Sequence, residues 1–320
     1  MSEPSTTKHQ SDDLVALSRE IIQKGSKSFA AAARFFDRET RASAYLLYAW
    51  CRHCDDVIDG QELGFGIANT ATHDPVAALA RLQQTTRDAL AGNPMRDPVF
   101  AAFQRVVAKH AIPHRHPLEL LDGFAMDVTE RRYETLEDTL SYCYHVAGVV
   151  GVMMSCIMGE RAEETLDRAS DLGIAFQLTN IVRDIVPDAA VGRVYVPEAW
   201  LVEAGLSRET LADPNNRAAL FSVAQRMLTT AEVYYLSSEA GVARLPVRSA
   251  WAVATARKVY REIGQEVLRR GPAAWDSRVS TSKRQKIWSA VSGGGTAIGA
   301  RLPGHARDAP RTGLYERPKA

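Results

Sequence analysis

The 320-residue sequence lacks most features of a secreted, membrane-spanning or nucleic-acid-binding protein. Its four cysteines suit a reducing compartment, and residues 1–13 are polar, without the apolar segment of a secretory signal. The longest apolar runs, such as residues 146–158, are shorter than the roughly 20 residues that cross a bilayer. A net charge of +1 gives no general affinity for nucleic acid. We therefore expect a cytoplasmic protein without a nucleic-acid partner.

Signals of β-structure and of a dinucleotide site are also missing. No stretch of consequence alternates apolar and polar residues as a half-buried strand does, and no repeat of solenoid length is found. The sequence Gly64-Phe65-Gly66 lacks the third glycine and the preceding strand of a dinucleotide-binding turn, so we expect no nicotinamide cofactor. Helical periodicity predicts a single all-α domain over residues 13–291, a disordered segment at 1–12 and a flexible basic tail at 292–320.

The most informative stretch is 48–60, an apolar run that turns acidic and stops at Gly60. Such a run predicts a helix, with Asp37 as a candidate N-cap and Gly60 just past the end. Residues three and four apart share a helix face. The polar residues that this spacing brings to one face are Tyr48, Arg52, Asp55 and Asp59.

A second stretch, 177–188, repeats this spacing with similar oxygen-bearing side chains. Its members are Gln177, Asn180, Asp184 and Asp188. Like charges on one face repel, so two acidic faces in one domain indicate a shared site for divalent cations and a polyanion. Pro187 should kink or end this helix near Val186, so the position of Asp188 is less firmly predicted than that of Asp184.

Carboxylate and amide oxygens are hard ligands that suit Mg²⁺ or Mn²⁺, and Mg²⁺ is typically held by one or two carboxylates together with substrate phosphates. The loop at 192–197 carries Arg193, which is expected to fold back over the acidic site. The apolar helix at 140–158 contains Gly148 and Gly151, which indicate either close backbone packing or room for a bulky ligand. Together these features suggest a diphosphate site above a dry cavity for a long hydrocarbon.

Three other patterns have competing explanations. Cys51 and Cys54 form a C-x-x-C, but without a second cysteine pair or a βαβ pattern we interpret them as small helix residues. A di-iron carboxylate bundle needs Glu-x-x-His, and no such motif occurs in the chain. Asp127, on a mostly apolar helix, belongs either to the site or to a surface face.

Three separated motifs resemble those of the squalene/phytoene synthases, and most closely the bacterial phytoene synthases of carotenoid operons. They are the stretches 55–59, 142–148 and 177–188, supported by 51–54 and 192–197. The resemblance covers about residues 26–265 and implies the all-α class I isoprenoid synthase bundle with a central cavity. It implies head-to-head condensation of two geranylgeranyl diphosphates, through a cyclopropyl intermediate, to phytoene.

The resemblance also implies residue roles. Metal ligands would be Asp55, Asp59, Asn180, Asp184 and Asp188. Diphosphate contacts would come from Lys27, Ser28, Arg52, Arg183 and Arg193, with Tyr260 near the diphosphates. The reacting centre would be lined by Phe29, Tyr48, Tyr142, Val146 and Gln177, and Tyr142 matches a tyrosine thought to assist proton removal. Gly60 and Pro187 depart from the family pattern, and Pro187 puts the metal role of Asp188 in doubt.

Two alternatives remain at this stage: a relative that makes squalene or dehydrosqualene from farnesyl diphosphate, and a non-catalytic lipid-binding or assembly protein. A non-catalytic protein would be expected to lose its acidic pairs, and both acidic stretches are present here, which disfavours that alternative. Because a C40 hydrocarbon is too apolar to diffuse through water, we expect peripheral membrane association and contact with downstream carotenoid enzymes.

Overall fold

A computed structural model describes residues 18–20, 22, 27–61, 73–280, 282–299 and 310–319, and within these ranges every regular element is a helix. The predicted disordered segment at 1–12 lies outside the described residues. The N-terminal half contains α2 (Lys27–Ala33), α3 (Arg38–Asp59), α4 (Pro75–Leu90), α5 (Pro98–His110), α6 (Arg115–Val128), α7 (Leu136–Cys143), the π-helical turn η1 (Tyr144–Gly148) and α8 (Val149–Ile157). The second half contains α9 (Glu163–Ala190), α10 (Glu198–Glu203), the short turns η2 (Arg208–Thr210) and η3 (Pro214–Asn216), α11 (Arg217–Arg244), α12 (Val247–Arg270), η4 (Gly271–Trp275) and α13 (Lys283–Gly299).

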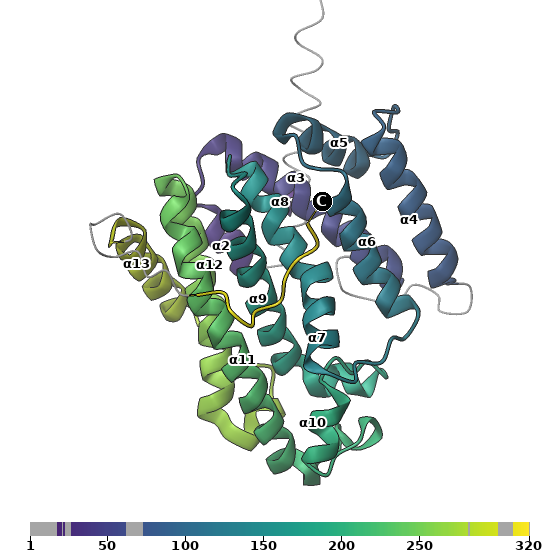
Figure 1. The fold of residues 1–320 in the computed structure, drawn as a ribbon, viewed down its shortest axis with the longest axis vertical. Helices are drawn as coiled ribbons and strands as arrows, with labels where there is room; N and C mark the ends of the chain where they lie inside the picture. Colours follow the sequence, from purple (N-terminus) through teal and green to yellow (C-terminus); the bar gives the residue numbers. More distant parts are fainter. Residues whose placement is uncertain are drawn as a thin grey trace, which may run out of the picture.

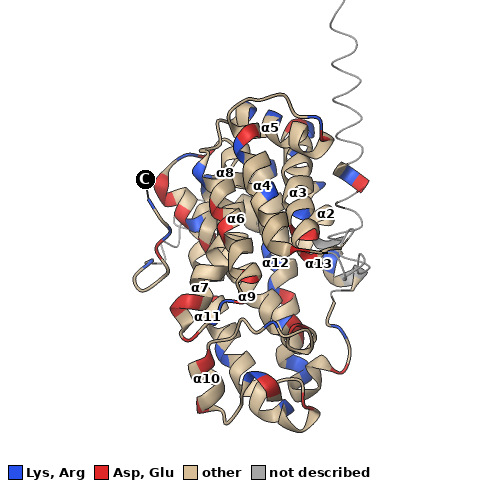
Figure 2. Cartoon of the chain, turned by 90° about the vertical axis from the view of Figure 1, so that its right-hand side faces the viewer, with Lys and Arg blue, Asp and Glu red and all other residues tan. Residues whose placement is uncertain are grey.

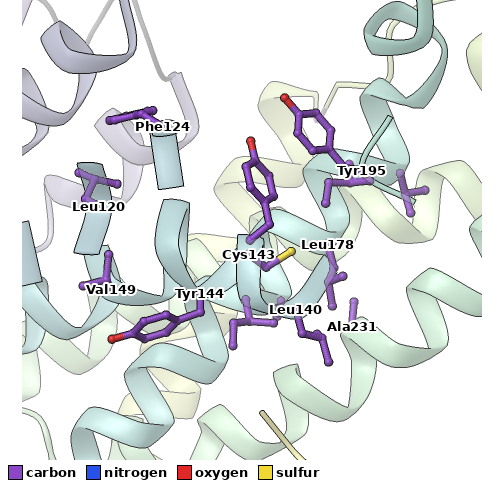
Figure 3. Close-up of a cluster of buried hydrophobic side chains, with 14 of the residues drawn as sticks. Leu120, Phe124, Leu140, Cys143, Tyr144, Val149, Leu178, Tyr195 and Ala231 are labelled. Carbon is purple, nitrogen blue, oxygen red and sulfur yellow. The ribbon is translucent and has the colours of Figure 1, made fainter. Parts of the chain in front are cut away.

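The helices form one bundle around a shared apolar core, which confirms the predicted all-α class (Figure 1). The central helix α9 packs against α8, α11 and α12, so it contacts helices from both halves of the chain. Figure 3 shows part of the core, with side chains from Leu120 and Phe124 on α6 to Leu178 on α9 and Ala231 on α11. Charged residues of both signs are interspersed over the surface in Figure 2, in keeping with the small net charge.

Local signals set the ends of α3 as predicted. The Asp37 carboxylate accepts hydrogen bonds from the backbone N–H groups of Glu39 and Thr40, both at 2.9 Å, which satisfies two donors of the first turn. Gly60 adopts the left-handed conformation at φ 62° and donates its N–H to the Asp56 carbonyl. The cap at Gly60 therefore ends α3 directly after Asp59, the last acidic residue of the helix.

Helix α9 differs from the prediction at Pro187, because it continues through the proline to Ala190. Pro187 lies in the last turn, so its missing N–H removes a single hydrogen bond close to the end of the helix. Asp188 therefore stays one helical turn beyond Asp184.

The predicted continuous helix over 140–158 begins earlier, at Leu136, and contains the π-turn η1. A π-turn inserts one residue into the helical spacing and rotates the residues that follow it. Tyr142 and Val146 consequently line different pockets, although they are four residues apart.

The glycines of this helix permit a close crossing with α9. A Cβ atom added at Gly151 would lie 2.3 Å from the carbonyl oxygen of Ala169. A Cβ added at Gly173 on α9 would lie 2.3 Å from the carbonyl oxygen of Ala147. Because Gly151 also borders an apolar cavity, both explanations offered by the sequence apply to it.

The segment Leu136–Ile157 also has the length and mean hydropathy, 1.5, of a membrane-spanning helix, and it is the one such segment among the described residues. Of its most apolar window, 61% is buried inside the protein. Core helices of globular proteins can have the same length and hydropathy. The apolar composition of this segment is therefore explained by its position in the centre of the bundle.

The prediction of a flexible tail over residues 292–320 does not hold for two segments that the structure describes. Helix α13 continues to Gly299. Residues 310–319, drawn in yellow in Figure 1, run across α9 and α8. There Arg311 bonds Asp171 at 2.8 and 2.9 Å, and the buried Arg317 bonds Asp167 at 2.7 Å. These acidic partners lie about half the chain away in sequence, so the composition of the tail alone gave no sign of them.

Candidate active site

The two acidic stretches meet in a polar pocket of about 280 Å³. Its walls come from the end of α3, from α6, from α7, from the second half of α9 and from the loop that follows α9. The site residues predicted from the sequence that line it are Asp55, Asp59, Tyr142, Gln177, Asn180, Arg183, Asp184, Asp188 and Arg193. The spacing on each helix therefore brings its carboxylates to a common cavity, although 118 or more residues separate the stretches.

Arginines neutralise the carboxylates of this pocket. Arg52 contacts Asp55 at 3.0 Å and Asp56 at 2.7 Å. The Arg183 Nε donates to both oxygens of Asp184 at 3.0 Å.

The loop arginine closes the pocket from the other side. Arg193 bonds Asp59 at 2.5 Å, which confirms that the loop after α9 folds back over the acidic residues. This bond raises the pKa of the Arg193 guanidinium, so its charge is permanent.

Two carboxylates of the pocket, Asp55 and Asp188, are held in surroundings that disfavour their charge. Burial and, to a smaller extent, the charge of the neighbouring Asp184 raise the pKa of Asp188 to about 7. Burial also raises the pKa of Asp55 to about 6 against the opposing effect of Arg52. The Asp55 side chain is 42% exposed, and it lines the pocket, so a cation in the pocket has access to it.

The donor set fits a hard divalent cation. The Oδ1 of Asn180 is buried without a hydrogen-bond partner among the described residues, while its Nδ2 donates to Gln177 at 3.4 Å. In the described part of the chain, no three Asp, Glu, His or Cys side chains converge as a complete metal cage. Mg²⁺ commonly takes one or two carboxylates and completes its shell with water and phosphate oxygens, so spaced oxygen ligands suit it.

Two polar residues of the pocket, Asp127 and Tyr195, were not assigned from the sequence. Asp127 accepts hydrogen bonds from the hydroxyls of Tyr142, at 3.2 Å, and Tyr195, at 2.9 Å. The two tyrosine rings stack with their centroids 4.6 Å apart. An acid on an apolar helix was the available signal for Asp127, and the structure places it in the site and not on a surface face.

A second, apolar cavity of about 330 Å³ adjoins the acidic pocket. The two share Gln177 and Asn180 in their walls, so they meet at α9. The predicted site residues that line the apolar cavity are Phe29, Tyr48, Val146, Gln177 and Tyr260.

Aromatic rings stand in the walls of this cavity. Phe29 stacks on Tyr48 with ring centroids 5.4 Å apart, and Phe176 stacks on Tyr260 at 4.2 Å. Lys27 and Ser28 begin α2, directly before Phe29, but their side chains lie outside the described part of the structure.

Both cysteines of the C-x-x-C motif pack against apolar surroundings. Cys51 lines the apolar cavity and Cys54 is buried in the core, and both are free thiols. Burial raises the pKa of Cys51 to about 12, so the thiol stays protonated and is a poor nucleophile or metal ligand.

Known proteins share this sequence and fold. The sequence profile of the squalene/phytoene synthases matches residues 22–285. A 15-cis-phytoene synthase of Enterobacter agglomerans is 55% identical over 298 residues, 93% of this chain and 100% of that protein. A 15-cis-phytoene synthase of Pantoea ananas is 53% identical over 300 residues, 93% and 96% of the two chains. A crystal structure of a dehydrosqualene synthase with ligand gives a TM-score of 0.80 at 28% identity, covering 89% of this chain and 96% of that one. Since the profile spans most of the sequence, the chain belongs to the squalene/phytoene synthase family.

Proposed function

We propose that the chain is a phytoene synthase that joins two geranylgeranyl diphosphates head to head, through prephytoene diphosphate, and releases two diphosphates. The observation that carries the proposal is the contact between a carboxylate- and arginine-lined pocket and an apolar cavity at Gln177 and Asn180. Such a pair of pockets matches a substrate with a diphosphate at one end and a long hydrocarbon at the other. The high identity to named phytoene synthases favours this product over squalene.

The diphosphates would bind in the acidic pocket. Arg52, Arg183 and Arg193 are the cations that would contact their oxygens, together with Lys27 and Ser28 from the start of α2. The residues that would hold Mg²⁺ or Mn²⁺ are Asp55, Asp59, Asn180, Asp184 and Asp188. When bound, the metal supplies positive charge that neutralises the diphosphate as it leaves.

The hydrocarbon chains would occupy the apolar cavity, where the protein excludes water from the carbocation left by diphosphate departure. The rings of Phe29, Tyr48 and Tyr260 line this space and offer electron-rich faces to the cation. Without water, the cation reacts with the second hydrocarbon chain, and loss of a proton from carbon completes each bond formation.

Tyr142 would assist that proton loss. Its hydroxyl donates to Asp127 at 3.2 Å, and burial raises the pKa of the Asp127 carboxyl to about 6. Asp127 therefore both orients the phenol and has a raised affinity for a proton. We assign Tyr142 the proton-removing role and Asp127 the role of its partner.

Incubation of purified protein and Mg²⁺ with farnesyl or geranylgeranyl diphosphate, followed by identification of the hydrocarbon, tests the proposal. A C40 product is expected, and a C30 product without any C40 product would establish the squalene or dehydrosqualene alternative. Asp55→Ala and Asp184→Ala should each abolish turnover. Glu203→Ala, which removes an exposed acid on α10, is the matched control and should retain it. Full activity in both pocket variants would refute the metal assignment.

The apolar product also has a consequence for where the enzyme would lie in the cell. A C40 hydrocarbon needs an apolar acceptor, so we propose a cytoplasmic enzyme bound peripherally to the membrane, beside the carotenoid enzymes that use its product. Gentle lysis at low salt should leave the protein in the membrane fraction. Complete recovery in the soluble fraction would count against this location.

A further inference from the structure

Helix α13 presents an apolar face to the outside of the protein. The four large apolar side chains on this face have 63–71% of their surface exposed; they are Ile287, Trp288, Val291 and Ile298. Val291 follows Ile287 by four residues and Ile298 follows Val291 by seven, which places these three on one stripe along the helix. Trp288, three residues before Val291, widens that stripe. We call these four residues the α13 apolar face.

The opposite side of α13 is the side that attaches it to the protein. Gly293 packs so closely on α12 that an added Cβ would lie 2.6 Å from the Thr255 hydroxyl oxygen. Trp251 on α12 donates its indole N–H to the Ala290 carbonyl at 2.8 Å. Ala297 on the same side is buried. The helix is therefore apolar on both sides, and among the described residues only one side is covered.

The charged residues in the sequence of α13 have one sign. Helix α13 contains three cations, Lys283, Arg284 and Lys286, and no acid. From Ser277 to Arg307 the sequence has six lysines and arginines and no aspartate or glutamate, in a chain whose net charge is only +1. The neighbouring Glu262 on α12 accepts a hydrogen bond from Gln285 at 3.1 Å, and Arg269 pairs with it at 2.8 Å. A helix with an exposed apolar face and only basic charged residues in its sequence is complementary to an anionic bilayer surface.

The position of α13 relates this face to the apolar cavity. Helix α13 lies on the outer side of α12 and also contacts α2 (Figure 1). Both of those helices line the cavity, α2 through Phe29 and Ala32 and α12 through Val253 and Ala256. A bilayer on the α13 apolar face would thus lie one helix layer away from the space assigned to the hydrocarbon.

We propose that α13 is the membrane-docking element of this protein, with its apolar face inserted at the level of the acyl chains of an anionic bilayer. A second copy of the chain fits this face less well, because its α13 contains no acid that would complement the cations of the first copy. The inference takes peripheral membrane association from the proposed function and adds the surface responsible. It is tested by lipid binding, whereas the proposed reaction is tested by product identity, so either can fail alone.

The test is co-sedimentation of the full-length protein with vesicles of phosphatidylethanolamine and phosphatidylglycerol, and with vesicles of phosphatidylcholine alone. We expect binding to the anionic vesicles, at least tenfold weaker binding to neutral ones, and at least tenfold loss for the triple variant Ile287→Ser/Trp288→Ser/Val291→Ser. The matched control is Val202→Ser, which removes an isolated apolar side chain that is 75% exposed on α10 and should bind like the wild type. Turnover of detergent-dispersed substrate should persist in both variants, which shows that they fold.

A second measurement tests the same surface without the triple variant, which could fail to fold. Brominated acyl chains in the anionic vesicles should quench tryptophan fluorescence of the wild type, and the single variant Trp288→Phe should lose most of that quenching. Unchanged binding by a folded triple variant, or equal quenching in Trp288→Phe, would overturn the proposal. A dimer in light scattering that the triple variant converts to a monomer, without any vesicle binding, would assign the face to a second copy instead.

Discussion

Replacing Arg317 by methionine is expected to lower the free energy of unfolding by about 2–3 kcal/mol. The guanidinium has no exposed surface, and it bonds the largely buried Asp167 at 2.7 Å and also contacts Glu163. Removing one partner of a buried ion pair costs about 3–5 kcal/mol, because the other charge stays buried without compensation. Arg311 at 3.4 Å and Lys319 at 3.7 Å still face Asp167 in the variant, and methionine keeps most of the buried volume. We therefore expect a loss of stability at or just below the lower end of the general range.

Urea denaturation followed by circular dichroism measures this cost, with the slope of the transition compared between variants. Lys319→Met is the matched control, since its side chain is 56% exposed and its loss should cost at most about 0.5 kcal/mol. In a double-mutant cycle, Asp167→Asn should recover part of the loss in the Arg317→Met background. A cost below about 1 kcal/mol for Arg317→Met, or no coupling to Asp167, would refute the argument that residues 310–319 stabilise the fold.

Three further predictions concern the helix crossing and the acidic pocket. Gly151→Ala should destabilise by about 1–3 kcal/mol in urea, because its Cβ would meet the Ala169 carbonyl, whereas Gly295→Ala, with open space, should be neutral or stabilising. Asp188→Asn should raise the Tm of the metal-free protein at pH 8 by a few degrees while abolishing turnover. The pKa of Asp188 rises from an ordinary value of 3.8 to about 7 in the folded state, so its contribution to stability is complete below 3.8 and is lost as the pH rises through 7. The gain in Asp188→Asn should therefore be largest above pH 7, shrink as the pH falls to 5, and vanish only below the ordinary pKa. Chelation of divalent cations should abolish turnover, and Mg²⁺ with inorganic diphosphate should raise the Tm in a concentration-dependent way; an unchanged Tm at saturating concentrations would contradict the assigned site.

The parts of the fold that the sequence predicts are those that depend on local interactions. Asp37 and Gly60 mark the ends of α3 because capping involves residues within one turn. The alignment of Asp55 with Asp59, and of Asp184 with Asp188, follows from helical spacing alone. These local rules, combined with the cost of unpaired charge, were sufficient to predict a common acidic site.

Features that depend on distant parts of the chain were not predictable in this way. The π-turn η1 is a change of hydrogen-bond register inside an apolar helix, and no residue type in that helix marks it. The ion pairs of Arg311 and Arg317 join residues 140 and 150 positions apart. The partnership of Asp127 with Tyr195, across 68 positions, required the loop after α9 to be in place.

The pairing of arginines with acids in the pocket connects the two halves of the proposed site. Arg52, Arg183 and Arg193 each neutralise a pocket carboxylate, and they are also the cations assigned to the diphosphates. An arginine that turns towards a diphosphate leaves its carboxylate uncompensated in a site where burial already raises carboxyl pKa values. A cation must then take its place, so the affinities for diphosphate and for divalent cation depend on one another, and each increases the other by the same factor. Under the proposed function, the carboxylates and arginines would therefore act as one exchangeable set of charges, and this would explain why a pocket for an anionic substrate is lined with acids.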